Sequence, residues 1–327
     1  MTLKQRFAAA GLALAVGLAA SGAPKAASDA APPKAPVAPG EPPKIEWEHT
    51  ETEQVRLVMV PTVVTDHRGR PVRGLTARDF KLLEDNVPQK IDYLTAEADE
   101  QFSIAFLLDV SGSMRSLGRL DAAKVAIGEF VNSLRPGDQM GLVCFADEQV
   151  EWVTPFTADR KLFLKRLMVQ EGYGQTALFD ALAAAPRLVR DSIKGRRAIV
   201  LFTDGIDTAS KLSMSKAIQL ARSVNVPIYT VAFGAVPKNV KAKGTEEPSH
   251  RLLERFSAET GGLMFVVHEP EEAASAAATI DDELRFHYLI GYYPTSVVWD
   301  GSFRRLEVET KRRGLTIRTR SGYYANP

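Results

Sequence analysis

The sequence Phe-Ser-Ile-Ala-Phe-Leu-Leu-Asp-Val-Ser-Gly-Ser, at residues 102–113, decides the fold. Its first seven residues form an almost unbroken apolar run, which is typical of a strand that is buried on both faces of a sheet. The run ends in Asp109, and a loop of small residues with Ser111 and Ser113 follows it. We therefore predict a buried strand whose C-terminal end carries three oxygen-bearing side chains at alternating positions.

Residues 101–286 alternate such apolar runs with helix-like segments, which is the pattern of a parallel sheet covered by helices on both faces. Residues 120–134, for example, repeat apolar side chains at helical spacing, and Pro136-Gly137 follows them. The predicted strands are residues 102–108, 140–145, 198–202, 228–233 and 263–267, with an edge strand at 150–153. The predicted fold class is α/β, with a doubly wound, mostly parallel sheet.

Both flanks of this region, residues 45–100 and 287–327, have the composition of strands. The first flank has a β-branched run at 55–64, a helical turn at 75–80, and a hairpin formed by 81–83 and 89–94 around Asp85-Asn86. Each flank alone is too short for a good core. We expect the two flanks to join in one small β-sandwich, whose C-terminal strands are residues 286–293, 303–309 and 315–319.

Residues 1–23 have the features of an export signal. Lys4 and Arg6 precede an apolar run at 7–20 that is short for a membrane span and is followed by small residues. Residues 24–44 are rich in proline and alanine, which predicts an extended linker. We expect an exported protein, periplasmic or extracellular, with no membrane span after cleavage; an uncleaved membrane anchor is the alternative.

The composition excludes several classes of function. The 327 residues include 41 Lys plus Arg and 40 Asp plus Glu, so the formal charge of +1 gives no bulk attraction to nucleic acid or anionic membrane. The single cysteine, Cys144, lies in an apolar run, which predicts a core residue and no internal disulfide. The five histidines lie too far apart in the sequence for a Cys/His zinc site.

Two more oxygen-bearing residues are expected at the edge that carries Asp109. Asp204 follows the apolar run 198–202, and a doubly wound order makes that strand a neighbour of the strand before Asp109. Since neighbouring strands lie about 4.8 Å apart, both carboxylates can reach one cation. Thr176 follows a glycine-containing loop and is either a further oxygen ligand or the N-cap of the next helix. Helix capping is also the alternative for the two serines of the motif.

Together these residues resemble the metal-ion-dependent adhesion site of the von Willebrand factor type A (VWA) domain, which combines Asp-x-Ser-x-Ser with a distant Thr and a distant Asp. The resemblance covers about residues 101–286 and implies a Rossmann-like VWA fold. The Tyr-x-x-Gly-Tyr-Tyr-Pro element at 288–294 and the export signal also resemble secreted bacterial VWFA-related domain proteins. The resemblance implies that Mg²⁺, or else Mn²⁺ or Ca²⁺, is bound by Asp109, Ser111, Ser113, Thr176 and Asp204.

An incompletely coordinated cation can accept one more oxygen, and a carboxylate from a partner is electrostatically the best donor. The resemblance therefore implies an exported, cation-dependent protein-binding or adhesion module whose partner presents an acidic side chain. We expect no enzyme, because the sequence lacks the Gly-x-Ser-x-Gly and His-Glu-x-x-His motifs and a phosphate loop.

Three alternatives remain open at this level. The protein could be a VWA subunit that assists an ATPase, a metal-dependent hydrolase, or a chain whose β-sandwich recognises the partner while the metal stabilises its neighbour. Asp147, Asp180 and Asp207 are weaker candidates for a second group around the ion, and we interpret them first as solvated turns and helix starts.

Overall fold

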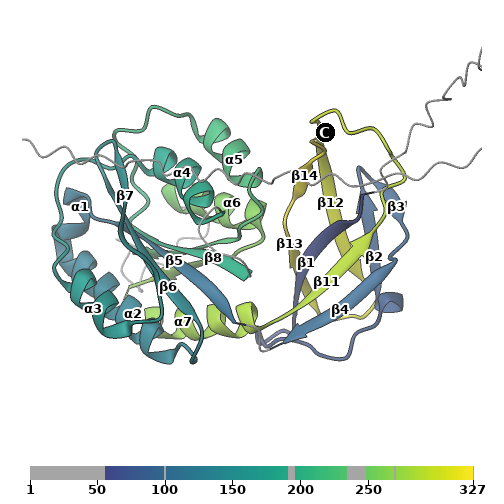
Figure 1. Cartoon of the computed structure of the whole chain (residues 1–327), viewed down its shortest axis with the longest axis horizontal. Coiled ribbons are helices and arrows are strands. Elements are labelled where there is room, and N and C mark those ends of the chain that lie inside the picture. The colour runs from purple at the N-terminus through teal and green to yellow at the C-terminus, as the bar shows by residue number, and fades with distance from the viewer. Residues whose placement is uncertain (1–55, 99–100, 191–195, 234–247, 269, 327) are drawn as a thin grey trace, which may run out of the picture. The chain divides into compact units, whose positions relative to one another are not determined.

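The computed structural model describes residues 56–98, 101–190, 196–233, 248–268 and 270–326, all within one compact unit, Thr52–Pro327 (Figure 1). The predicted export signal and the proline-rich linker lie outside these residues. In the described part of the chain, no helix combines the length and the apolar character that crossing a membrane requires.

The α/β domain is built on a six-stranded sheet in the order β10-β9-β8-β5-β6-β7. All neighbours are parallel except β7, which is antiparallel. Its place at the edge was expected for residues 150–153. All eight residues of β5 are buried. The α/β prediction is therefore confirmed, with strands β5 (Phe102–Asp109), β6 (Gln139–Ala146), β7 (Gln149–Thr157), β8 (Arg196–Thr203), β9 (Ile228–Phe233) and β10 (Met264–Val267).

Helices cover both faces of this sheet (Figure 1). Alternate residues of β5 point to opposite faces and therefore belong to two separate cores. Phe106 packs with α2 (Arg119–Ser133), α3 (Arg160–Met168) and α7 (Pro270–Arg285). Leu107 belongs to the opposite core, which contains side chains of α4 (Leu178–Arg190), α5 (Met214–Arg222) and α6 (Pro248–Thr260). Cys144 is buried in the first core, as its apolar setting predicted.

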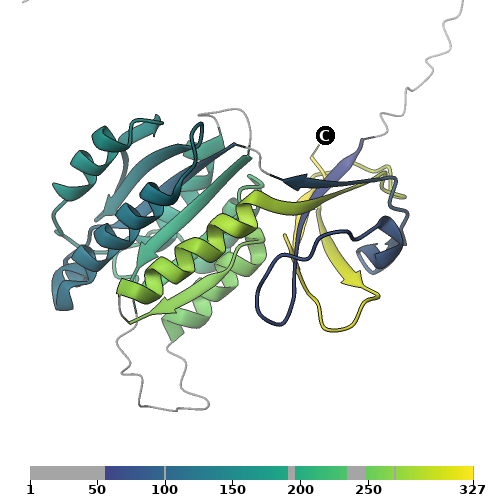
Figure 2. The same ribbon diagram turned by 90° about the horizontal axis from the view of Figure 1, so that it is seen from below.

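The β-sandwich consists of two four-stranded sheets, and strands from both flanks pair directly in each. β1 (Val58–Thr65) pairs with β11 (Phe286–Tyr292), which follows α7 without a loop (Figure 2). β13 (Thr316–Thr319) and β4 (Tyr93–Ala98) complete this sheet. The second sheet has the order β14-β12-β2-β3, with β14 (Gly322–Tyr324), β12 (Phe303–Thr310), β2 (Phe80–Glu84) and β3 (Val87–Gln89).

One prediction for the flanks needs correction, and one strand was not predicted. The hairpin turns at Asp85-Asn86, both with positive φ, but its second strand ends at Gln89, and β4 instead pairs with β11 in the other sheet. β14 has no counterpart among the predicted strands, because three residues are too few for a periodic pattern. The expected helical turn is present as a short 3₁₀ helix (Ala77–Asp79), where Thr76 and Asp79 form a capping box.

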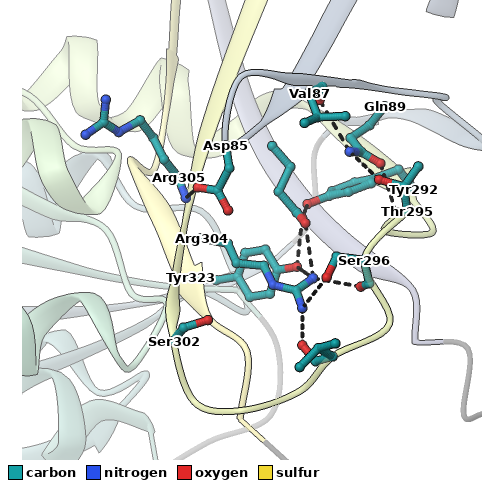
Figure 3. A network of polar contacts seen from close by, with 12 residues as sticks. Asp85, Val87, Gln89, Tyr292, Thr295, Ser296, Ser302, Arg304, Arg305 and Tyr323 are labelled. Atoms are coloured by element: carbon teal, nitrogen blue, oxygen red, sulfur yellow. Dashed lines mark hydrogen bonds and ion pairs between the residues drawn. The ribbon is translucent and has the colours of Figure 1, made fainter.

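A buried ion pair lies in the core of the sandwich (Figure 3). Arg304 Nη1 lies 3.1 Å from Glu84 Oε1, and the two side chains are 5% and 4% exposed. The other carboxylate oxygen accepts hydrogen bonds from the hydroxyls of Tyr292 and Tyr323. The Arg304 guanidinium also donates to the carbonyl of Ser296 at 2.9 Å, so it fixes the connection between β11 and β12.

Arg304→Met should lower the free energy of unfolding by about 3–5 kcal/mol, because it leaves the buried Glu84 carboxylate without its counter-charge. Urea denaturation of the chain measures this loss. Arg305→Met is the matched control: Arg305 is exposed, and its removal should change the free energy of unfolding by less than about 0.5 kcal/mol. If Arg304→Met loses no more free energy of unfolding than Arg305→Met, the ion pair does not stabilise the sandwich.

The stability of the fold should also fall in acid through His287. Burial lowers the pKa of this side chain from 6.5 to about 3, and Arg196 adds to the effect. Between these two pH values the unfolded chain binds a proton that the folded chain excludes, so stability is lost as pH falls below about 6.5, by up to about 1.4 kcal/mol per pH unit. In urea titrations at several pH values, His287→Gln should flatten this dependence, whereas the exposed His67→Gln should leave it unchanged.

Candidate metal centre

The two predicted carboxylates lie at the same edge of the sheet. Asp109 is the last residue of β5, and Asp204 directly follows the end of β8. β5 and β8 are parallel neighbours with Leu108 opposite Phe202, so both strands present their carboxyl ends at this edge. Asp109 is 0% exposed and Asp204 is 3% exposed. The sheet order expected from the sequence therefore brings these two residues together.

Both serines of the motif lie beside Asp109. Ser111 directly precedes the short helix α1 (Gly112–Arg115), and its backbone N–H donates to Asp109 Oδ1 at 2.9 Å. Its Oγ lies 3.0 Å from Ser113 Oγ and makes no capping hydrogen bond. Ser111 thus occupies an N-cap position, but its hydroxyl is directed to the other serine rather than to the helix backbone.

Thr176 is 2% exposed and follows a loop that packs against α1, where the Gly112 N–H donates to the Gly174 carbonyl at 3.0 Å. It does not cap α4. The first N–H groups of that helix are bound instead by Asp207 Oδ1, from Leu178, and by Ser210 Oγ, from Phe179, both at 2.9 Å. The prediction that Thr176 is the N-cap of α4 is therefore wrong. The role of Thr176 as a metal ligand stays a prediction.

The three weaker acidic candidates hold the surrounding loops together. Asp147 Oδ1 accepts a hydrogen bond from the backbone of Gln175 at 2.7 Å. The carboxylate of Asp180 accepts from the backbone of Lys211 and Leu212, each at 2.9 Å. Asp147 lies in a turn and Asp180 in the first turn of α4, as predicted, whereas Asp207 lies in the loop after β8 and accepts from the backbone of Leu178. All three carboxylates also bind segments that are distant in sequence, which no local pattern predicts.

The electrostatics of Asp109 fit a hard cation. Burial raises the pKa of this carboxyl to about 6; hydrogen bonds from Ser111 and Thr203 lower it, and the nearby Asp204 raises it. Within the described residues, no Lys or Arg forms an ion pair with Asp109, and a buried carboxylate without a counter-charge is costly. The described residues contain no cluster of three His, Cys, Asp or Glu suited to a metal, so serine and threonine hydroxyls would have to complete this donor set.

Two residues at this edge were missed from the sequence. Thr203 Oγ1 donates to Asp109 Oδ2 at 2.7 Å, and Arg119 Nη1 lies 2.9 Å from Asp204 Oδ2. Thr203 could have been noticed as the neighbour of Asp204, but nothing in the sequence connects Arg119 to a carboxylate 85 positions away. Asp204 is therefore already neutralised by the protein, so a cation at this edge shares that carboxylate with a guanidinium group.

Three exposed apolar side chains lie on the loops of the same edge. Leu117 is 86% exposed, between α1 and α2, and has a φ of 58°. Tyr173 is 47% exposed in the loop before Thr176, and Ile206 is 45% exposed in the loop after Asp204. Apolar and aromatic side chains exposed beside a polar site are typical of surfaces that contact another protein.

Comparison with known proteins agrees with the fold. Residues 104–206 match the family model of the von Willebrand factor type A domain, and the α/β domain around them has the VWA-like fold. A protein of Borreliella burgdorferi, described only as uncharacterized, is 32% identical over 203 residues, 55% of this chain and 57% of that protein. A UPF0353 protein of Mycobacterium avium is 26% identical over 216 residues, 60% of this chain and 64% of that protein.

The chain thus spans about three-fifths of the length of these two curated relatives. Among solved structures, a von Willebrand factor type A protein from Catenulispora acidiphila matches with a TM-score of 0.48 and 15% identity, over 73% of this chain and 71% of that one.

Gly174→Ala should disturb this edge. Gly174 has a φ of +67°, and an added Cβ would lie 2.2 Å from Asp147 Oδ2. Gly314→Ala is the matched control, because Gly314 has a φ of +75° with no atom within 4 Å of the added Cβ. Both variants should lose about 1–2 kcal/mol from the left-handed backbone, and Gly174→Ala a further 1–3 kcal/mol from the collision. Equal losses in urea denaturation would contradict this account.

Proposed function

We propose that this protein is an exported, divalent-cation-dependent module that binds or adheres to another protein. The observation that carries the proposal is the buried Asp109 carboxylate, which is hydrogen-bonded by Ser111, whose hydroxyl contacts that of Ser113, at the edge where Asp204 also lies. A site of this composition offers carboxylate and hydroxyl oxygens to one ion, and these are the ligands that Mg²⁺ prefers.

In this proposal Asp109, Ser111, Ser113, Thr176 and Asp204 hold the ion, directly or through water. The ion is Mg²⁺, with Mn²⁺ and Ca²⁺ as the other divalent candidates. Once bound, it supplies a positive site for one carboxylate oxygen from an Asp or Glu of the partner. The exposed Leu117, Tyr173 and Ile206 on the surrounding loops would contact apolar residues next to that acid.

The proposed compartment is the periplasm or the exterior, on the grounds of the export signal at residues 1–23. Binding is favoured over catalysis, because the serine hydroxyls of the motif contact each other and Asp109 is bound by Thr203 and the Ser111 backbone. In this arrangement the side chains serve as oxygen donors to an ion, and none of them is set up as a nucleophile with its own base.

Asp109→Ala should weaken Mg²⁺ binding by at least about 100-fold, since removal of groups that only support a ligand already costs about 10- to 100-fold. Isothermal titration calorimetry measures the affinity, and circular dichroism checks that the fold is retained. Asp121→Ala is the control: this acidic side chain of α2 is 85% exposed, and its removal should leave the affinity unchanged. An unchanged affinity in Asp109→Ala would refute the proposed centre.

The binding role is tested by capture of envelope and extracellular proteins in Mg²⁺ and again in chelator, with wild type and Asp204→Ala. We expect partners that are lost in both chelator and variant, and that lose binding when one of their acidic residues is changed to the amide. Partners retained in chelator would favour recognition by the sandwich. An ATPase partner, or Mg²⁺-dependent turnover of a substrate panel, would favour the alternatives of an ATPase subunit or a hydrolase.

A further inference from the structure

A small cavity of about 70 Å³ lies at the opposite edge of the α/β sheet from the candidate metal centre. Arg196, which lines it, is the first residue of β8, whereas Asp204 follows the last. Eight residues of strand separate the two edges by about 25 Å. The titratable side chains that line the cavity are Arg196, Tyr229, Glu283, His287, Arg318 and Arg320.

These lining residues carry three guanidinium groups and one carboxylate. That carboxylate, Glu283, is hydrogen-bonded by Arg318. Arg320 donates from Nη2 to the Met59 carbonyl at 3.0 Å, and its Nε is buried without a hydrogen-bond partner among the described residues. A buried guanidinium N–H that is left unpaired is costly, and an acceptor bound in the cavity that Arg320 lines would offer it a partner.

Two titratable side chains at the cavity lie where burial disfavours their charged forms. Burial lowers the pKa of His287, and the Arg196 charge adds to this effect. Burial also lowers the pKa of Arg320, although the neighbouring Tyr292 and Tyr323 oppose that change. Burial is the main cause of both shifts, and an anion in the cavity would favour the charged form of both groups.

We propose that this cavity is a binding site for a small oxyanion with the chemistry of phosphate or sulfate. One water needs about 10–15 Å³ of such space, so the cavity has room for a larger occupant. The planar fork of arginine matches two oxygens of an oxyanion at once. Arg196 and Arg320 are the principal ligands, and Arg318 lies beside them on β13.

The occupant of this site would stabilise the protein. Arg196 belongs to a strand of the α/β sheet, whereas Arg320 follows β13 of the sandwich, so one anion between them bonds both parts of the compact unit Thr52–Pro327. Binding to the folded chain alone raises its apparent stability with anion concentration. Stabilisation by the anion is independent of the proposed metal, so phosphate binding is measured in chelator.

Equilibrium dialysis of the wild-type chain against radiolabelled phosphate, at fixed ionic strength in chelator, should show one saturable site that sulfate competes for. Arg320→Met should weaken phosphate binding at least tenfold and abolish the rise in Tm that phosphate causes in the wild type. Arg313→Met removes an exposed arginine of the same segment and should behave as wild type.

The absence of saturable binding to the wild type, or equal affinity in Arg320→Met and Arg313→Met, would overturn the proposal. If Arg320→Met fails to fold, Arg196→Met tests the same cavity from the α/β side, and unchanged affinity there would overturn it equally. A rise in Tm that matched chloride reproduces would be a general salt effect and would also count against the site.

Discussion

The in-register pairing of β5 with β8 is the constraint on which the rest of the structure depends. β5 is buried along its whole length, so its backbone can be satisfied only by the parallel strands on either side. This pairing fixes where each strand ends, and it thereby sets Asp109 and Asp204 at one edge. The burial that stabilises the sheet also leaves the Asp109 carboxylate without a Lys or Arg partner among the described residues. A carboxylate in this setting favours a bound cation.

The loops at this edge are held by acidic side chains that bond backbone groups far away in the sequence. Asp147 ties the turn after β6 to the loop before Thr176, and Asp207 and Asp180 connect the loop after β8 to α4. These hydrogen bonds fix the loops on either side of Thr176, and Asp207 and Ser210 bind the first N–H groups of α4. Contacts within the chain therefore fix the loops at this edge, which reduces the ordering that binding of a ligand there would require.

The two edges of the α/β sheet carry opposite electrostatic character. Carboxylates gather where β5 and β8 end, and arginines line the cavity where β8 begins. The arginine-lined cavity depends on the sandwich, since Arg318 and Arg320 come from the C-terminal flank. The sandwich itself needs strands of the two flanks to pair, as β1 and β11 do across more than 200 residues of intervening sequence.

The sequence by itself determined the α/β class, the buried strands and the joining of the flanks, because apolar runs and turn residues are local signals. It also predicted that Asp109 and Asp204 share an edge, through the general rule for doubly wound sheets. Only the tertiary structure decided that Arg119 neutralises Asp204, that Asp207 rather than Thr176 caps α4, and that β4 leaves the hairpin for β11. These contacts join residues distant in the chain, and no local pattern encodes which distant side chain will meet a given carboxylate.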